Sequence, residues 1–195
     1  ALVVLNGHAW RVNALTAFTD PVTGELRLVS GSNDATVRVW NPASGSANEA
    51  EPEGHSKAVS ALVTFVDPAT GALRVATGSK DIRVWDAETG SAVLVIDVGS
   101  SVKALVFFTD PATGAPRLVT SSGKVFDPIA GGAAIAEPGE LPKAVRQRLR
   151  GEVPFADPAT GAPRLACGCY KKVSIFDPVA GGEALVVLEG HTREV

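Results

Sequence analysis

Short apolar runs alternate with polar turn segments along the whole chain of 195 residues. The first fifty residues hold three strong runs and a weaker fourth, at 12–18, 27–32, 36–40 and after Gly45. Runs of this length, rich in Val, Leu and Ile and bounded by Gly, Pro, Asp and Asn, are typical of β-strands. The runs 104–108 and 184–188 are apolar without alternation, which indicates strands buried on both faces. The pattern therefore predicts an all-β fold built from short strands.

The chain repeats itself with a period of about 45 residues. An Asp-Pro-X-Thr-Gly phrase recurs at spacings of 47, 43 and 47 residues, at 20–24, 67–71, 110–114 and 157–161. Its proline presets φ and its glycine supplies a positive φ, so each copy predicts a tight hairpin turn. A Val/Ile-Trp/Phe-Asn/Asp phrase follows each copy, at 39–41, 84–86, 125–127 and 175–177. The third repeated phrase is a Gly-His pair, at 7–8, 54–55 and 190–191.

Each period holds four short strands, and strands buried on both faces need a neighbouring sheet on either side. A β-propeller supplies that environment, because each four-stranded blade stacks between two others around an axis. We therefore predict an all-β propeller of four-stranded antiparallel blades, forming one half-ring domain over 1–195. Its repeats are expected at approximately 7–53, 54–98, 99–141 and 142–189, with terminal overlap at 1–6 and 190–195.

The repeats resemble those of the WD-repeat β-propeller family over essentially the whole chain. The first repeat is the best copy, with Gly7-His8 followed by LVSGSND at 28–34 and TVRVW at 36–40. In that family a histidine ahead of the blade, a Ser or Thr on the second strand, an Asp in the next turn and a Trp on the third strand form a hydrogen-bonded tetrad. The resemblance implies two structural tetrads: His8, Ser30, Asp34 and Trp40, and His55, Thr77, Asp81 and Trp85.

The third and fourth repeats depart from the family pattern. Valine replaces the histidine and phenylalanine replaces the tryptophan in both. The residues at these positions and on the second strand are Val98, Phe126 and Thr120 in the third repeat, and Val145, Phe176 and Cys167 in the fourth. Because a satisfied buried polar network rigidifies its surroundings, we expect these two blades to be held by apolar packing alone and to be locally less stable.

The two ends of the chain carry nearly the same sequence. Residues 1–12, ALVVLNGHAWRV, match residues 184–195, ALVVLEGHTREV, so the chain holds four full periods plus a twelve-residue overlap. The family it resembles usually closes rings of seven or eight blades, and stacked repeats need neighbours at both ends. We therefore expect two chains to form a homodimer that closes one eight-bladed ring. The alternative is that the chain is a repeat fragment of a larger WD-repeat protein.

Composition and charge remove several classes of function. The chain is 45% hydrophobic and 20% charged with a net charge of −3, so it has no general attraction for nucleic acid or an anionic membrane. No apolar run approaches the ~18 residues of a transmembrane helix, and no signal peptide opens the chain. The only cysteines, Cys167 and Cys169, lie two apart, which favours neither a disulfide nor an oxidising compartment. We expect a cytoplasmic protein that binds neither membrane nor nucleic acid.

Residues that could carry catalysis are few and dispersed. The only histidines, His8, His55 and His191, are separated by one or three periods, so we expect them to lie around the ring. The two cysteines lack the second pair or the nearby histidine of a zinc site. The sequence contains neither a phosphate-binding GxxxxGK loop nor a GxSxG nucleophile motif. It therefore predicts no catalytic residue, no metal and no cofactor.

Two regions are candidates for binding a protein partner. In the family that the chain resembles, partners often bind the loops that lead into the blades; the residues in such positions are Trp10, Arg11, Lys57, Lys103 and Arg193. Trp and Arg are favoured at binding hot spots, although Trp10 could equally pack over its own blade. The second region is a basic segment with four positive charges in eight residues, Lys143, Arg146, Arg148 and Arg150. It is either a patch for an acidic partner or a solvated irregular loop.

These observations favour a non-catalytic scaffold for protein–protein interaction, built from WD repeats and acting on a partner whose identity the sequence does not encode. The first alternative is a propeller that binds a glycan or another small molecule. Such a site would need convergent aromatic side chains, and the chain has three Trp and one Tyr. An enzyme is the second alternative, and the absence of a dense His, Asp, Glu or Cys cluster argues against it.

Overall fold

The computed structural model describes residues 3–21, 23–47, 54–110, 113–135, 152–169, 172–178, 180 and 183–191. Over these residues the chain forms β-strands, turns and irregular loops, without a helix. Within the described ranges, accordingly, no helix has the length and apolar character needed to span a membrane. The predicted all-β class is confirmed for this part of the chain.

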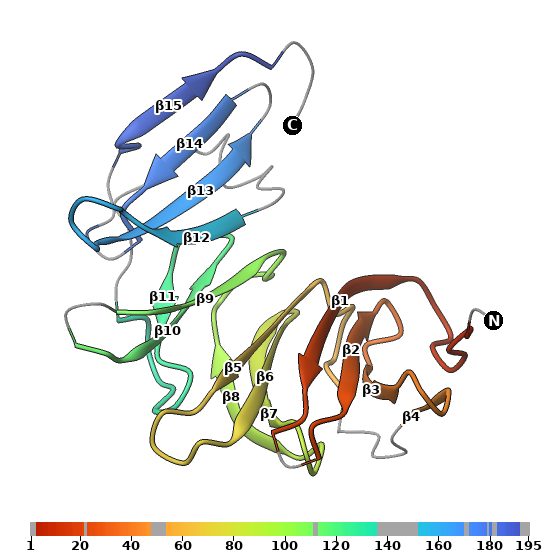
Figure 1. The fold of residues 1–195 in the computed structure, drawn as a ribbon. Helices are drawn as coiled ribbons and strands as arrows, with labels where there is room; N and C mark the ends of the chain where they lie inside the picture. The colour runs from red at the N-terminus through yellow and green to blue at the C-terminus, as the bar shows by residue number, and fades with distance from the viewer. Residues whose placement is uncertain are drawn as a thin grey trace. The chain divides into compact units, whose positions relative to one another are not determined.

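The described strands form four antiparallel sheets, and within each sheet they pair in sequence order (Figure 1). The first sheet contains β1 (Val12–Thr19), β2 (Leu26–Ser32), β3 (Val37–Asn41) and β4 (Ser46–Ala47). The second contains β5 (Ala61–Val66), β6 (Leu73–Gly78), β7 (Asp81–Asp86) and β8 (Ala92–Asp97). The third contains β9 (Leu105–Thr109), β10 (Pro116–Thr120) and β11 (Val125–Phe126). The fourth contains β12 (Glu152–Ala156), β13 (Pro163–Cys169), β14 (Lys172–Phe176) and β15 (Val186–Glu189).

The third sheet has three described strands where four were predicted. Ile135 donates its backbone N–H to the Val125 carbonyl at 2.8 Å, just as Leu185 donates to Ile175 at 2.8 Å immediately before β15. This bond lies at the last described residue of the segment, and residues 136–151 lie outside the described residues. Sheets of three or four antiparallel strands fit the predicted blades. Closure into a ring and the number of blades stay predictions.

Each Asp-Pro-X-Thr-Gly phrase forms the turn between the first two strands of its sheet. The glycine N–H donates to the aspartate carbonyl at 2.7–2.8 Å in all four copies, at Gly24, Gly71, Gly114 and Gly161. These glycines have φ values of 70–72°, in the left-handed region that glycine adopts without a steric penalty. Five residues therefore reverse the chain and set the register of the strands on either side.

The chain divides into two compact units, residues 1–102 with the first two sheets and residues 103–195 with the last two. In the first unit, one face of the first sheet packs on one face of the second. We call the face of the first sheet that takes part in this contact the trailing face. It carries Phe18, Val29, Val37 and Val39. We call the face of the second sheet that takes part in this contact the leading face. It carries Leu62, Leu73, Val75 and Trp85, and Val59 lies just ahead of β5. The buried side chains of both faces form one hydrophobic cluster.

The second unit repeats this arrangement with its own residues. The trailing face of the third sheet contributes Val106, Phe108, Val119 and Val125, and the leading face of the fourth sheet contributes Leu165, Cys167 and Phe176. All seven side chains are at most 9% exposed. In both units, then, the leading face of one sheet packs on the trailing face of the sheet that precedes it. That the two units belong to a single half-ring domain stays a prediction.

Two glycines at the ends of second strands each permit the close approach of a buried valine from a later loop of the first unit. A Cβ at Gly31 would lie 2.5 Å from Val59 Cγ1, and a Cβ at Gly78 would lie 2.5 Å from Val102 Cγ1. Both valines are at most 2% exposed. Because real Cβ atoms do not approach another carbon so closely, only glycine fits at these positions without moving the valine that packs on it.

We expect Gly31→Ala to lower the free energy of unfolding by about 1–3 kcal/mol, because the new methyl group overlaps Val59. Val59→Ala should also destabilise the protein, since it leaves a cavity. The double variant should be more stable than the sum of the two losses implies, because each substitution relieves the effect of the other. Urea unfolding of the wild type and the three variants measures this coupling. Additive losses would contradict the packing described here.

Candidate functional site

The first predicted tetrad joins a loop and two strands through a continuous chain of hydrogen bonds. Trp40 Nε1 on β3 donates to Ser30 Oγ on β2 at 2.7 Å, and Ser30 Oγ lies 2.7 Å from His8 Nε2. His8 Nδ1 lies 2.9 Å from Asp34 Oδ2. Because the Asp34 carboxylate only accepts, Nδ1 carries the proton, and the Ser30 hydroxyl then donates to Nε2. Each donor in the chain is thus matched with an acceptor.

Asp34 also holds the loop that contains His8. It accepts hydrogen bonds from the Ala9 backbone N–H at 2.9 Å and from the Thr36 hydroxyl at 2.6 Å and backbone N–H at 3.0 Å. Burial alone would raise the pKa of Asp34, but the hydrogen bonds from Thr36, His8 and Ala9 outweigh it and hold the pKa well below its usual range. Asp34 is therefore a charged anchor for both the loop and the β2–β3 turn.

The second tetrad has the same chain of hydrogen bonds, and its histidine is more deeply buried than that of the first. His55 Nδ1 is 2.6 Å from Asp81 Oδ1, His55 Nε2 is 2.7 Å from Thr77 Oγ1, and Trp85 Nε1 donates to Thr77 Oγ1 at 2.7 Å. Burial lowers the pKa of His55, although the Asp81 carboxylate opposes this shift. The pKa of Asp81 is lowered: burial would raise it, and the His55 and Arg83 hydrogen bonds outweigh that effect.

Close contacts with neighbouring atoms explain why each Gly-His pair has glycine at its first position. A Cβ at Gly7 would lie 3.0 Å from Trp40 Cη2, and a Cβ at Gly54 would lie 2.8 Å from the Ala35 carbonyl oxygen. That carbonyl accepts the His55 backbone N–H at 3.0 Å, and Ala35 itself has a φ of 69°. The β2–β3 turn of the first sheet is therefore bonded directly to the loop that leads into the second sheet.

In the part of the chain that the structure describes, apolar side chains stand at tetrad positions of the third and fourth sheets. Phe126, Cys167 and Phe176 are at most 5% exposed, and Val98 is 4% exposed, whereas Val145 lies outside the described residues. We expected apolar packing alone to hold the third sheet, and this is wrong, because a hydroxyl pair also joins its residues. Thr120 Oγ1 lies 2.8 Å from Ser122 Oγ, because the adjacent turn supplies a hydroxyl where the histidine is missing. Lower local stability of these sheets stays a prediction.

A repeated arginine on the second strand was missed by the sequence analysis. In each sheet its guanidinium bonds carboxylates near the Asp-Pro turn or at the end of the third strand: Arg27 to Asp20 and Glu25, Arg74 to Asp67 and Asp86, Arg117 to Asp127, and Arg164 to Asp157 and Asp177. All four are half-buried. The signal was present, because an arginine stands seven residues after the aspartate in every copy of the phrase. Such pairs tie the turn to the strands behind it.

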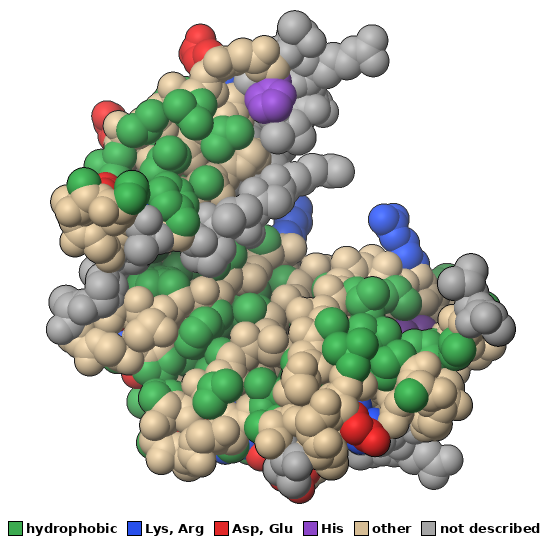
Figure 2. Space-filling model, in the orientation of Figure 1, with side chains coloured by type: hydrophobic (Ala, Val, Ile, Leu, Met, Phe, Trp, Pro, Cys, Tyr) green, Lys and Arg blue, Asp and Glu red, His purple; other side chains and the backbone are tan. Residues whose placement is uncertain are grey.

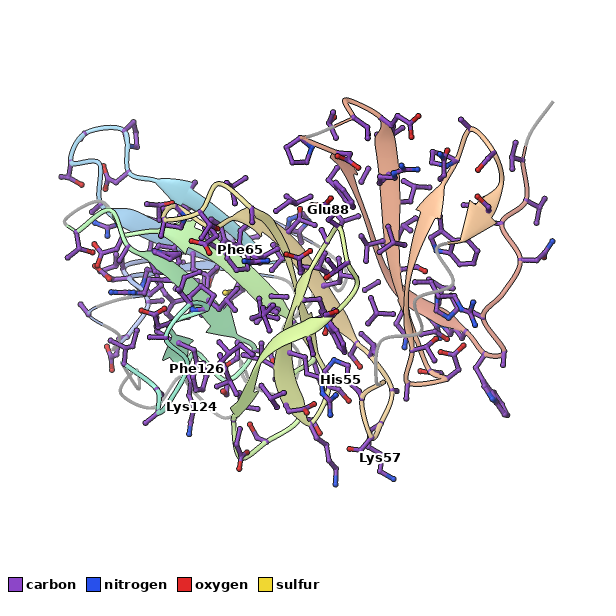
Figure 3. The ribbon with its side chains drawn as sticks, turned by 90° about the horizontal axis from the view of Figure 1, so that it is seen from below. His55, Lys57, Phe65, Glu88, Lys124 and Phe126 are labelled. Atoms are coloured by element: carbon purple, nitrogen blue, oxygen red, sulfur yellow. The ribbon has the colours of Figure 1, made fainter. Side chains whose placement is uncertain are left out.

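The loops that lead into the first two sheets form the rim of the first unit, which we define by Trp10, Arg11 and Lys57. All three side chains are exposed, Trp10 by 70%. The backbone beneath them is fixed: Ser32 Oγ donates to the Trp10 carbonyl at 3.1 Å, Asn33 N–H to the Arg11 carbonyl at 2.8 Å, and Ser79 Oγ to the Lys57 carbonyl at 2.9 Å. Figure 3 shows Lys57 at the end of the second sheet opposite to Glu88.

The other predicted binding residues do not all fall within the described structure. Lys103 belongs to the second unit and is exposed, with its backbone N–H bonded to Ser121 Oγ at 3.1 Å. Arg193 and the basic segment with Lys143, Arg146, Arg148 and Arg150 lie outside the described residues. Cys167 is buried. In the ranges that the structure describes, no three His, Cys, Asp or Glu side chains are grouped so as to hold a metal ion.

Comparison with known protein families gives one match, in the first part of the chain. Residues 1–41, which include the whole first tetrad, match the family model described as WD domain, G-beta repeat. The resemblance to WD repeats is thereby confirmed over these residues, and the match supports a WD-repeat family for the chain. A search of curated proteins found no match.

Among solved structures, the chain is similar to the crystal structure of the computationally designed Ika8 protein. The TM-score is 0.53 at 21% sequence identity, and the match covers 100% of this chain and 66% of that chain. This chain thus spans just under two thirds of the length of the designed protein. Similarity at this level of identity bears on the fold alone.

We expect Thr77→Val to destabilise the second sheet by about 3 kcal/mol, because it leaves Trp85 Nε1 and His55 Nε2 buried without their common partner. Thr120→Val should cost about 1 kcal/mol, since Thr120 has only local partners. Hydrogen exchange of β6 and β10 amides measures the two losses. Thr77→Ser is the matched control, because serine fills the same role at Ser30 and should retain most of the protection. Equal losses for the two valine variants would argue against the tetrad.

The free energy of unfolding should also decrease in two steps as the pH is lowered. The folded pKa of His55 lies below its unfolded value of about 6.5, so its contribution is present above that pH and is lost as the pH falls through the folded pKa. The folded pKa values of Asp34 and Asp81 lie below about 3.9, so their contributions are lost only below that pH. Urea midpoints measured from about pH 7.5 to about pH 1.5 should show the first step and the second. His55→Gln should remove the first step, and an unchanged first step in that variant would disprove its assignment.

Proposed function

We propose that the chain is a non-catalytic protein–protein interaction scaffold built from WD repeats, and that its rim contacts the partner. One observation carries this proposal: Trp10 is 70% exposed on a backbone that is fixed on both sides. Ala9 N–H is bonded to Asp34, and the Trp10 carbonyl is bonded to Ser32. A large aromatic side chain held in this way loses little conformational entropy when it binds, so it contributes strongly to affinity.

The charge of the rim indicates the chemistry of the partner. Arg11 follows Trp10 directly, and Lys57 occupies the position of Trp10 in the next loop, 47 residues later. Exposed cations beside an exposed indole favour a segment that offers carboxylates together with an apolar side chain. Lys103, Arg193 and the basic segment with Lys143, Arg146, Arg148 and Arg150 carry the same charge and are proposed as further contacts for such an acidic partner.

The scaffold proposal includes an assembly. We propose that the sheets stack as propeller blades and that two chains form one eight-bladed ring, as a cytoplasmic homodimer. Support comes from the regular stacking of a leading face on a trailing face within each unit. A ring of this kind would present equivalent rims on both chains, and hence two copies of the partner surface.

Peptide display on the wild-type chain should select acidic sequences that contain an aromatic or large aliphatic residue. We expect Trp10→Ala to weaken binding of the selected peptides by roughly thirtyfold, the effect of losing a hot spot worth about 2 kcal/mol. Lys57→Glu should weaken it further through charge repulsion, more strongly at low salt than at high salt. Isothermal titration calorimetry with the purified chain measures both effects.

The matched control for the rim is Glu88→Lys, which reverses a charge at the opposite end of the second sheet (Figure 3). It should leave peptide affinity unchanged. Selected peptides that bind Trp10→Ala and Lys57→Glu as tightly as the wild type would show that the rim is not the binding surface.

A further inference from the structure

The leading face of the first sheet is apolar and exposed. Val12 is 45% exposed, Leu15 63% and Leu26 54%, and they share this face with half-buried Leu28 and with Trp40. A surface groove of about 500 Å³ runs over it. Figure 2 shows hydrophobic side chains gathered over the first sheet. Continuous apolar surface of this kind marks an interaction site more often than it marks an idle surface.

The second sheet shows what such a face binds in this protein. The residues 47 positions later, Val59, Leu62 and Leu73, belong to the leading face that packs on the trailing face of the first sheet. Val59 is 0% exposed where its counterpart Val12 is 45% exposed. The two leading faces carry the same residue types at the same positions, and one is covered by a sheet while the other is not. The ligand that matches the uncovered face is therefore the trailing face of another sheet of this type.

The trailing face of the fourth sheet offers such a surface. Its residues correspond to those that contact the second sheet from the first: Phe155 to Phe18, Ala166 to Val29, Val173 to Val37 and Ile175 to Val39. Gly168 stands at the position of Gly31, where the absent Cβ admits a valine from the next sheet. This face is also open at its margins, with Phe155 39%, Val186 45% and Leu188 51% exposed.

We infer that the leading face of the first sheet binds the trailing face of the fourth sheet of a second copy of this chain. The inference rests on the stacking of sheets as blades in the proposed function and adds the faces, the partner and the polarity of the contact. The contact is head-to-tail, since different surfaces of the two copies meet. Two such contacts related by a twofold axis close a two-chain ring and leave neither face exposed.

The duplicated ends of the chain fit this junction. Residues 1–6 and 184–189 carry nearly the same sequence, so both could form the outer strand beside β14 at a junction between copies. In the structure that edge is taken by β15, with Val186 opposite Ile175 and Leu188 opposite Val173. Residues 3–6 are then the surplus copy, and they line the groove on the leading face. An incoming trailing face would replace the contact of this short segment by that of a whole sheet.

Solution mass by light scattering after size-exclusion chromatography tests the contact. We expect the wild type to have twice the chain mass of 20.0 kDa. Leu15→Glu on the leading face and Phe155→Glu on the trailing face should each reduce the mass to the single-chain value of 20.0 kDa, because each buries a carboxylate in both junctions. Val95→Glu is the matched control, since Val95 is 54% exposed on the outer strand β8, and it should leave the mass doubled.

Mixing the two disabled variants tests the polarity. One junction of the mixed pair carries both glutamates, whereas the other pairs the intact leading face of one copy with the intact trailing face of the other. The mixture should therefore form a two-chain species that neither variant forms alone. Contact between two identical faces predicts a different pattern: leading-to-leading contact would leave Phe155→Glu dimeric, and trailing-to-trailing contact would leave Leu15→Glu dimeric.

Three results would overturn the inference: a wild-type mass of 20.0 kDa, a doubled mass in Leu15→Glu, or no two-chain species in the mixture. Circular dichroism establishes that each variant retains its β-structure, and both substitutions are at partly exposed sites that folding of one chain does not bury. Peptide binding through the rim separates this inference from the proposed function. A monomeric chain that still binds rim-selected peptides would refute the contact between copies and the two-chain ring, and would leave the rim as the partner surface.

Discussion

The structure depends on face-to-face packing of successive sheets. A single sheet of three or four short strands cannot enclose its own apolar side chains, because both of its faces carry them. Val29 becomes fully buried only when Val59, Val75 and Trp85 of the following sheet lie against it. The same requirement explains Gly31, whose missing side chain lets the next sheet approach. It also accounts for the exposed apolar face that the first sheet presents.

The tetrads stabilise a different part of the structure, since they connect irregular loops to the sheets. Hydrogen bonds from Trp40 through Ser30 and His8 to Asp34 run from the buried third strand to the loop before the first. Such a network stabilises the folded state most where it is buried, because a buried donor without an acceptor raises the free energy of the fold. Its consequence for function is that the rim stands on fixed backbone. The repeated arginines connect turns to strands at the opposite ends of the sheets.

Much of this arrangement could be predicted from the repeats. The spacing of the Asp-Pro-X-Thr-Gly phrase located the hairpin turns, and the resemblance to WD repeats brought together the side chains that the structure joins around His8 and His55. The role of Arg74 escaped prediction because its carboxylate partners, Asp67 and Asp86, come from separate turns that meet only in the folded sheet. Thr120 formed an unforeseen bond with Ser122 for the same reason, since a turn brought the two hydroxyls together.

By itself, the sequence determined the strands, the turns and the order of the sheets, because these follow from local φ preferences and from short-range periodicity. Tertiary structure decided which faces are covered. Val12 and Val59 are the same residue at the same position of two repeats, yet one is 45% exposed and the other is fully buried. The physical reason is that burial depends on the presence of a neighbouring sheet, and a residue's own repeat carries no information about whether that neighbour exists.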